Sequence, residues 1–226
     1  MERSKLVIGV SGKMQHGKDT VGEHLIAKYG FRRLSFGDKV KEVCMNYDNS
    51  TPELREHWNK KVAREVLDDE SRADEVDASM QRVCPGVWKK LTYEECYVTK
   101  PASARIVMQQ FATNEMRRLD PDCWVRCAMQ QCQQEKGSRW VITDMRFKNE
   151  AYWIEAVDNS QLWRVRRPIP DAPGAEHTSE VELDDYPFEV FVDNDSTIEA
   201  LYKKVDRIVK RVLSGARPFA VGEEVY

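Results

Sequence analysis

The sequence lacks the features that would place a protein in a membrane or on nucleic acid. No apolar run approaches the roughly 20 residues that a membrane-spanning helix needs. The formal net charge is only −3 over 226 residues, so the chain has no overall attraction for nucleic acid or for anionic membranes. Low-complexity tracts are also missing. With 41% hydrophobic and 32% charged residues, the composition is that of an ordinary soluble enzyme with one large α/β domain or two small ones.

The six cysteines contain no C-x-x-C pair of the kind that holds structural zinc. No secretory signal pattern comes before the first apolar run, residues 6–10. We therefore expect reduced, mostly buried thiols in a cytoplasmic protein. The cysteines are Cys44, Cys84, Cys96, Cys123, Cys127 and Cys132.

What the sequence does contain is a glycine loop, residues 12–20, between an apolar run and a helical pattern. Its spacing, G-x-x-x-x-G-K, is typical of a phosphate-binding loop in this context. The glycines let the backbone wrap polyphosphate oxygens, and the helix that begins near Lys18 adds N–H groups and a positive dipole end. A glycine turn without a ligand is the alternative. The predicted nucleotide-binding residues are Gly12, Lys13, His16, Gly17, Lys18, Asp19 and Thr20.

The residue after Lys18 departs from the usual Ser or Thr, whose hydroxyl would bind Mg²⁺. Here Asp19 takes that place and Thr20 follows, and either oxygen donor suits the metal. Asp144 ends a short apolar strand and is the expected second support for Mg²⁺. An apolar strand that simply ends in an acid is the alternative for Asp144.

Apolar periodicity predicts a mostly parallel sheet of about five strands with helices on both faces. The expected strands cover residues 6–10, 31–36, 139–144, 161–165 and 189–192. The expected helices cover residues 18–29, 39–45, 53–69, 102–119, 122–134, 149–158 and 196–213. Asp38 is either the cap of the second helix or a ligand contact at the sheet edge. The last helix is expected to open with the capping box from Ser196 to Glu199, and the tail, 214–226, to be irregular.

Two segments fall outside this regular pattern. Residues 48–101, which include the polar stretch 68–77, are interpreted as an inserted substrate-side region with one helix and a mobile loop. Residues 166–185 contain arginines, three prolines and Gly174, which suits a lid that closes over a transferring phosphoryl group. A solvated basic turn is the alternative. The whole chain, 1–226, is expected to form a single domain that carries both segments.

Several stretches resemble phage-type deoxynucleoside monophosphate kinases, in the same order along the chain. They are G-x₄-G-K-D-T at residues 12–20, S-F-G-D-K-V-K at 35–41, Q-Q-F-A-T-N-E at 109–115 with W-V at 124–125, D-M-R-F-K-N-E at 144–150, and R-P…H-T-S-E…D-N-D-S between 167 and 196. Residues 48–101 lie outside the resemblance. Ala112 and Asn114 depart from the family pattern, which bears on substrate preference more than on the reaction.

The resemblance implies a P-loop kinase that uses ATP and Mg²⁺ to convert a deoxynucleoside monophosphate to the diphosphate. Catalysis would then be positioning and charge stabilisation, with Lys18 and Asp144 central. The residues assigned to charge neutralisation are Arg146, Arg166 and Arg167. The residues assigned to the acceptor nucleotide are Asp38, Gln109, Thr113, Arg117, His177 and Glu180. The expected partners are small nucleotides, in host-cell cytoplasm if the source is a phage, while a homodimer is left open.

Three other functions use the same kind of loop. A kinase of hydroxymethylated bases in DNA should carry a basic groove, which the net charge does not suggest. A guanine-nucleotide switch should carry N-K-x-D, but Val62 ends the segment that begins at Asn59. A module that binds nucleotide without transferring phosphoryl groups is the third. The sequence does not decide which bases are accepted.

Overall fold

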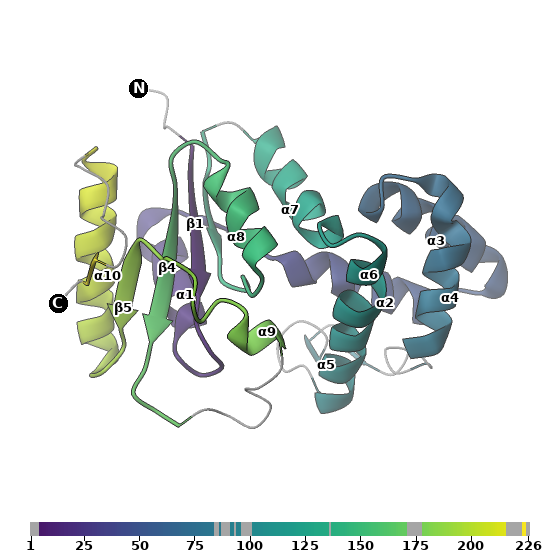
Figure 1. Cartoon of the computed structure of the whole chain (residues 1–226), viewed down its shortest axis with the longest axis horizontal. Helices are drawn as coiled ribbons and strands as arrows, with labels where there is room; N and C mark the ends of the chain where they lie inside the picture. Colours follow the sequence, from purple (N-terminus) through teal and green to yellow (C-terminus); the bar gives the residue numbers. More distant parts are fainter. Residues whose placement is uncertain are drawn as a thin grey trace. The chain divides into compact units, whose positions relative to one another are not determined.

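The computed structural model describes residues 5–83, 86, 91–92, 94–95, 101–135, 137–170, 178–215 and 223–224. The chain divides into two compact units (Figure 1). Residues 1–35 and 132–226 form the first unit, and residues 36–131 form the second. The segment 48–101 lies wholly within the second unit.

The first unit contains a six-stranded sheet in the order β2-β3-β1-β4-β5-β6, with every strand pair parallel. Its strands are β1 (Leu6–Ser11), β2 (Arg32–Leu34), β3 (Arg139–Ile142), β4 (Ser160–Arg166), β5 (Val190–Asp193) and β6 (Glu223–Glu224). All of β1 and the five central residues of β4 are buried, as expected for strands covered on both faces. The predicted α/β fold with a parallel sheet is confirmed. The short β6 corrects the expectation of an irregular tail.

Helices cover both faces of this sheet (Figure 1). The helices are α1 (Lys18–Tyr29), α8 (Lys148–Glu155), the short α9 (Thr178–Val181) and α10 (Ile198–Leu213). Leu25 of α1 and Val205 of α10 share a core with Ile8 of β1. On the other face, a Cβ placed at Gly9 would lie 2.9 Å from Cδ1 of Ile154 in α8, so the glycine lets this helix pack closely.

The second unit is helical. Its elements are α2 (Phe36–Asn49), α3 (Pro52–Val66), the 3₁₀ turn η1 (Glu70–Arg72), α4 (Ala73–Val83), α5 (Ala102–Gln109), the π-helix η4 (Gln110–Met116), α6 (Arg117–Leu119) and α7 (Cys123–Gln134), which ends in the first unit. Their apolar faces meet in one core, which includes Val43, Val62, Met80, Phe111 and Trp124.

Three local predictions were wrong. Residues 48–101 contain more than the one expected helix, since the polar stretch 68–77 holds η1 and the first half of α4. Val76 and Met80 of α4 are fully buried and anchor this helix. The segment 102–119 is not one α-helix, since the π-helix interrupts it. The cap of α10 is Thr197 and not Ser196: the Thr197 side chain accepts a hydrogen bond from the backbone N–H of Ala200.

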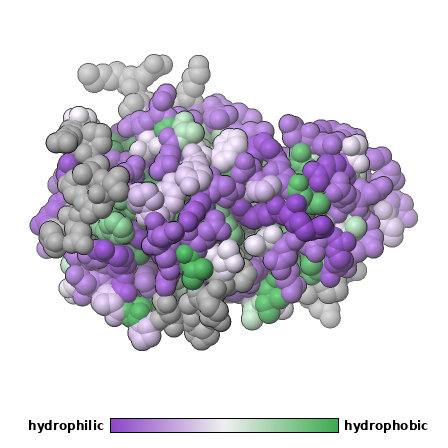
Figure 2. Space-filling model, viewed as in Figure 1, coloured by the Kyte–Doolittle hydropathy of each residue, from purple (hydrophilic) through white to green (hydrophobic). Residues whose placement is uncertain are grey.

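The surface agrees with the sequence in two respects. None of the helices in the described part of the chain is both long and apolar enough to cross a membrane. In the view of Figure 2 the visible surface is mainly hydrophilic, and hydrophobic side chains form small separate groups.

The cysteines that the structure describes, Cys44, Cys123, Cys127 and Cys132, are free thiols, as expected. Burial raises the pKa of Cys123 to about 12, so this thiol stays protonated and unreactive.

Candidate functional site

The glycine loop connects the carboxyl end of β1 to the start of α1, at the edge where open parallel sheets bind ligands. A Cβ at Gly12 would lie 2.8 Å from the carbonyl oxygen of Val165, so only glycine fits beside β4. Gln15 and Gly17 have positive φ angles, 65° and 98°, so the backbone turns sharply here. The local strand–loop–helix arrangement is therefore the one that the spacing predicted.

Gly17 is also the residue at the N-terminal cap of α1. Because glycine has no side chain to cap the helix, the N–H groups of the first turn are left for another acceptor. The Lys18 side chain is 11% exposed, and its Nζ lies 3.2 Å from Oδ2 of Asp19, which is well exposed. A cation and helical N–H groups thus converge where an anionic ligand would bind.

Asp144 follows β3, the strand beside β1. Its Oδ2 accepts a 2.7 Å hydrogen bond from Oγ of Ser35, which follows β2. Helix α1 approaches this strand end closely, since a Cβ at Gly22 would lie 2.4 Å from Cγ2 of Thr143. The oxygen donors expected to serve a metal, on Asp144 and in the first turn of α1, therefore come from neighbouring elements.

Among the described residues, no group of three or more His, Cys, Asp or Glu side chains could by itself hold a metal ion. Mg²⁺ in nucleotide sites usually takes only one or two protein oxygens, with phosphates and waters filling the other positions. Carboxylates and a hydroxyl are hard donors, which suits that metal. The side chains present fit a magnesium–nucleotide complex better than a protein-only metal cage.

Arg146 lies just after Asp144 and is held at two points. Its backbone N–H donates a 2.6 Å hydrogen bond to Oε2 of Glu150, in the first turn of α8. Its guanidinium pairs with Glu180 and donates a 3.2 Å bond to the carbonyl of Ser179, both in α9. The other carboxylate oxygen of Glu180, Oε2, is buried and accepts no hydrogen bond from the described part of the chain. Two predicted site residues, Arg146 and Glu180, therefore contact each other.

The two arginines that end β4 and follow it have different surroundings. Arg166 makes a bidentate pair with Asp193 at the end of β5, with N–O distances of 2.7 and 2.9 Å. Arg167 is exposed, and its Nη1 lies 3.5 Å from the carbonyl oxygen of Gln15 in the glycine loop. Of these two, Arg167 is the one directed to the loop.

A third arginine of the same basic cluster, Arg164, was given no site role from the sequence and contacts the residue just before the loop. Arg164 is buried in β4, donates a 2.9 Å bond to Oγ of Ser11 and pairs with Asp184. Burial lowers the pKa of its guanidinium, and Asp184 opposes that change. Asp184 also lies 3.5 Å from Nζ of Lys13, so one carboxylate ties the glycine loop to the segment after α9. No local sequence pattern predicts the pair of Arg164 and Asp184, because these residues lie 20 positions apart.

Asn194 is a second contact that the sequence did not assign. It directly follows β5, and its Nδ2 donates a 3.0 Å hydrogen bond to the carbonyl of His16. A polar residue directly after a strand at the ligand edge was the available signal. The described segment 178–185 of the expected lid contains α9, while His177 and residues 171–176 lie outside the described residues.

The remaining predicted acceptor residues belong to the helical unit. Asp38 lies in the first turn of α2, not at its cap, and accepts a 2.5 Å bond from the buried Nζ of Lys41. Gln109 ends α5, Thr113 lies in the π-helix, and Arg117 donates a 3.1 Å bond to the carbonyl of Pro121.

The π-helix that carries Thr113 has a specific support. The indole Nε1 of Trp124 donates a 3.1 Å hydrogen bond to the carbonyl of Ala112, inside the π-helix. The ring of Trp124 also meets Phe111 edge to face, with the ring centres 5.9 Å apart. A π-helix is rare and frequently occurs at functional sites. That this segment contacts a substrate stays a prediction.

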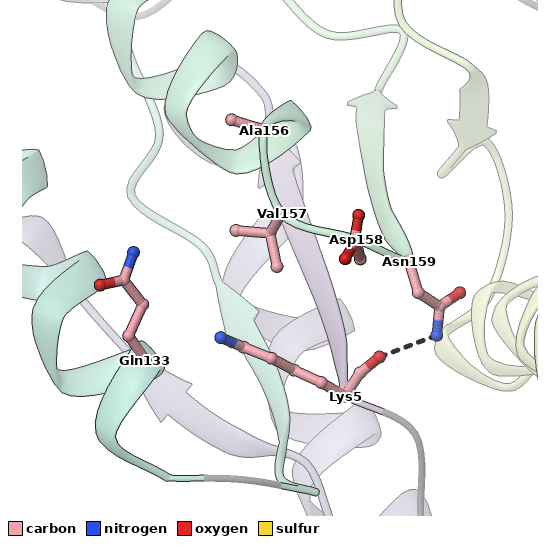
Figure 3. Close-up of a pocket in the computed structure, with 6 residues that line it drawn as sticks. All are labelled: Lys5, Gln133, Ala156, Val157, Asp158 and Asn159. Atoms are coloured by element: carbon pink, nitrogen blue, oxygen red, sulfur yellow. Dashed lines mark hydrogen bonds between the residues drawn. The ribbon is translucent and has the colours of Figure 1, made fainter.

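A pocket of about 390 Å³ lies at the opposite edge of the sheet (Figure 3). Lys5, just before β1, and Asn159, just before β4, line it and share a 2.8 Å hydrogen bond from Nδ2 of Asn159 to the Lys5 carbonyl. The glycine loop follows the other end of β1, so this pocket is separate from the site described above.

Three comparisons relate this chain to known proteins. A family model described as deoxynucleotide monophosphate kinase matches residues 55–205, which is more than half of the chain. The "Putative deoxynucleotide monophosphate kinase" of Acanthamoeba polyphaga mimivirus is 25% identical over 214 residues, which cover 88% of this chain and 94% of that protein. The crystal structure of TT1252 from Thermus thermophilus aligns with a TM-score of 0.44 at 16% identity, covering 95% of this chain and 99% of that one.

Proposed function

Since this chain belongs to the deoxynucleotide monophosphate kinase family, we propose that it transfers the γ-phosphoryl group of ATP to a deoxynucleoside monophosphate. An oxygen of the acceptor's 5′-phosphate forms a bond to the γ-phosphorus. The bond between that phosphorus and the oxygen bridging it to the β-phosphate breaks, giving ADP and a deoxynucleoside diphosphate. The acceptor oxygen is already a nucleophile, so positioning and charge stabilisation suffice for catalysis.

The observation that carries this proposal is the glycine loop at the carboxyl edge of a parallel sheet, with Lys18 at its end and Asp144 after the adjacent strand. The loop and the first turn of α1 supply N–H groups for the β and γ phosphates, and Lys18 neutralises part of their charge. Gly12, Lys13, His16 and Gly17 form this cradle.

The proposed metal is Mg²⁺, which would be held by Asp144 and by Asp19 or Thr20 when ATP is bound. It would supply charge neutralisation across the β and γ phosphates. Ser35 keeps the Asp144 carboxylate in a fixed orientation through its 2.7 Å hydrogen bond. Asp19 is more exposed than Lys18, so its carboxylate would be accessible to the metal from solvent.

Arginines are proposed to stabilise the charge that spreads over the transferring phosphoryl group. Arg167 is exposed beside the loop, whereas Arg146 and Arg166 are paired with Glu180 and Asp193. Arg167 is therefore the proposed direct contact, and Arg146 would need to exchange Glu180 for phosphate. Residues 166–185 would act as a lid that excludes water.

The acceptor nucleotide is proposed to contact Asp38, Gln109, Thr113 and Arg117 of the helical unit, together with His177 and Glu180. Amide, hydroxyl and guanidinium groups provide the donors that a base edge and a 5′-phosphate require.

An ADP-release assay with each of the four deoxynucleoside monophosphates tests this function. We expect turnover with at least one of them and none with duplex DNA that carries hydroxymethylated bases. Turnover with the modified DNA alone would replace this proposal with a DNA-base kinase. Binding of ATP without ADP release on any acceptor would leave a nucleotide-binding module.

A further inference from the structure

A loop that turns its N–H groups toward a phosphate leaves its carbonyl groups on the outside. The positive φ angles of Gln15 and Gly17 produce such a turn in residues 15–17. The outward carbonyls need donors of their own, because a buried or half-buried carbonyl without a partner is costly. The carbonyl of His16 has such a donor, Nδ2 of Asn194 at 3.0 Å.

The side chain of Asn194 also lies against Gly17, whose φ of 98° already favours glycine. A Cβ added to Gly17 would lie 2.6 Å from Nδ2 of Asn194, well inside contact distance. The side chain of Asn194 therefore fills the space beside the last loop residue before Lys18. It touches the loop at both its carbonyl and its glycine.

The backbone on both sides of Asn194 is fixed. Its own N–H donates a 2.7 Å hydrogen bond to the carbonyl of Arg166, so the residue extends the β4–β5 pairing. The preceding Asp193 is held by the bidentate contact from Arg166. Lys204 of α10 donates to the carbonyl of Asp193 at 2.9 Å and to Oδ1 of Asp195 at 3.0 Å. The backbone of Asn194 is thus held in place at the end of β5, and its side chain donates from there to the loop.

We propose that Asn194 is a positioning residue for phosphate binding: it holds the His16 carbonyl outward, so that the N–H groups at positions 17 and 18 face the β and γ phosphates. Arg166 and Lys204 act through Asn194 by fixing its backbone. This inference rests on the proposed function only in that the loop's ligand is a nucleotide polyphosphate. The inference does not depend on which monophosphate accepts the phosphoryl group.

The test uses two variants, Asn194→Ala and Asn194→Asp, and two probes, ATP and inorganic tripolyphosphate, each with Mg²⁺. Alanine removes the donor without adding charge, and aspartate places an acceptor against the His16 carbonyl. We expect both probes to bind about tenfold more weakly to Asn194→Ala, the size of one lost hydrogen bond. Asn194→Asp should lose at least as much. Asn194 is only half-buried, so circular dichroism should report an unchanged fold.

Asn159→Asp is the matched control. Asn159 also donates its side-chain amide to a backbone carbonyl, that of Lys5, but at the opposite edge of the sheet. This variant loses the same kind of bond and gains the same charge, and we expect unchanged binding of both probes.

The two probes separate positioning from direct contact. Equal losses for ATP and tripolyphosphate support the proposal, because the loop reads phosphates only. A loss for ATP alone would mean that Asn194 contacts the nucleoside, and unchanged binding of both would mean that the bond to His16 is incidental; either result overturns the proposal. A wild-type protein that binds neither probe would remove the proposed function and this inference together, whereas one that binds both but phosphorylates no monophosphate would remove the proposed function alone.

Discussion

Oγ of Ser35 lies 2.7 Å from Oδ2 of Asp144, and this bond joins the ends of β2 and β3. The two residues are 109 positions apart in the sequence. Ser35 is almost fully buried, so its hydroxyl has a fixed place from which to orient the carboxylate. An acid held in this way costs little further ordering when it meets a metal–nucleotide complex.

Asp144→Asn should therefore cripple turnover and raise the Mg²⁺ concentration needed for half-maximal activity, because an amide is a weaker ligand for this metal than a carboxylate. Ser35→Ala should shift the same titration less, by roughly tenfold or under, since it removes one orienting hydrogen bond. Parallel titrations of Asp19→Asn report which carboxylate lies closer to the metal. If Asp144→Asn keeps turnover and Mg²⁺ dependence within a few-fold of wild type, Asp144 only ends a strand.

Lys18→Ala should lower kcat/KM by roughly 10²–10³-fold, the scale of one lost donor to transition-state charge. Its thermal unfolding without ligand should barely change, because the partner of Lys18 among the described residues is the exposed Asp19 carboxylate. Lys28→Ala is the control on the same helix: it breaks the contact with Asp206 and should lower stability while turnover is kept. A folded Lys18→Ala protein with normal kinetics would contradict the proposed role.

Arg166→Ala and Arg167→Ala should give different kinetics. Arg167→Ala should lower kcat and kcat/KM together, by about 10³-fold or more if Arg167 contacts the transition state. Arg166→Ala releases Asp193, so we expect a lower unfolding temperature and a higher KM for ATP with a smaller effect on kcat. Steady-state kinetics at saturating acceptor distinguish the two.

The lid is tested separately by hydrogen exchange across residues 166–185, with and without a bisubstrate dinucleotide. We expect slower exchange in the complex. Unchanged exchange, together with normal kcat in both arginine variants, would indicate a solvated turn.

Acid should destabilise the contact between α1 and α10 through Asp206. Burial raises the pKa of this carboxyl, but hydrogen bonds from Lys28, His24 and Tyr29 outweigh burial and hold the pKa well below its usual value of 3.8. The folded protein then binds this proton more weakly than the unfolded chain does. The stability from Asp206 is complete above the unfolded pKa and is lost as the pH falls below it.

Asp206→Asn should accordingly cost about 1–3 kcal/mol of unfolding free energy at pH 7, and the difference from wild type should shrink between pH 4 and pH 2. Denaturant titrations across this range measure it. Asp185→Asn, which breaks an exposed pair with Lys148, is the control and should change stability little at any pH. A difference that is the same at every pH would mean that Asp206 acts through packing alone.

The parts of the fold that the sequence predicted are those with strong local patterns. Three elements lie within a residue or two of their predicted bounds. They are the strand before Gly12, the helix capped by Gly30 and the strand that contains Val165. Helix α4 was missed because its first half is polar and only Val76 and Met80 mark its buried face. The π-helix was missed because its side chains keep an ordinary helical pattern, while its support comes from Trp124.

The residues of the candidate site likewise differ in whether a local sequence pattern predicts them. The loop motif is contiguous, so its residues and their order follow from the sequence. The partners of its residues are distant: Asp184 meets Lys13, Asn194 meets His16, and Arg166 is held by Asp193. Sequence spacing carries no information on such pairs. The different surroundings of Arg166 and Arg167 became clear only from the structure, in which β4 and β5 are neighbouring strands.

The order of strands in the sheet has a consequence for how the chain is made. β1 is synthesised first, yet both of its neighbours, β3 and β4, lie after residue 138. The helical unit, 36–131, is one continuous stretch, so all of its residues are made before β3 begins. The sheet of the first unit is completed later, and residues 15–17 cannot gain the support of Asn194 until 194 of the 226 residues have been translated. Nascent chains released before that point lack Asn194 and α10, and we expect them to bind ATP more weakly than the full chain does.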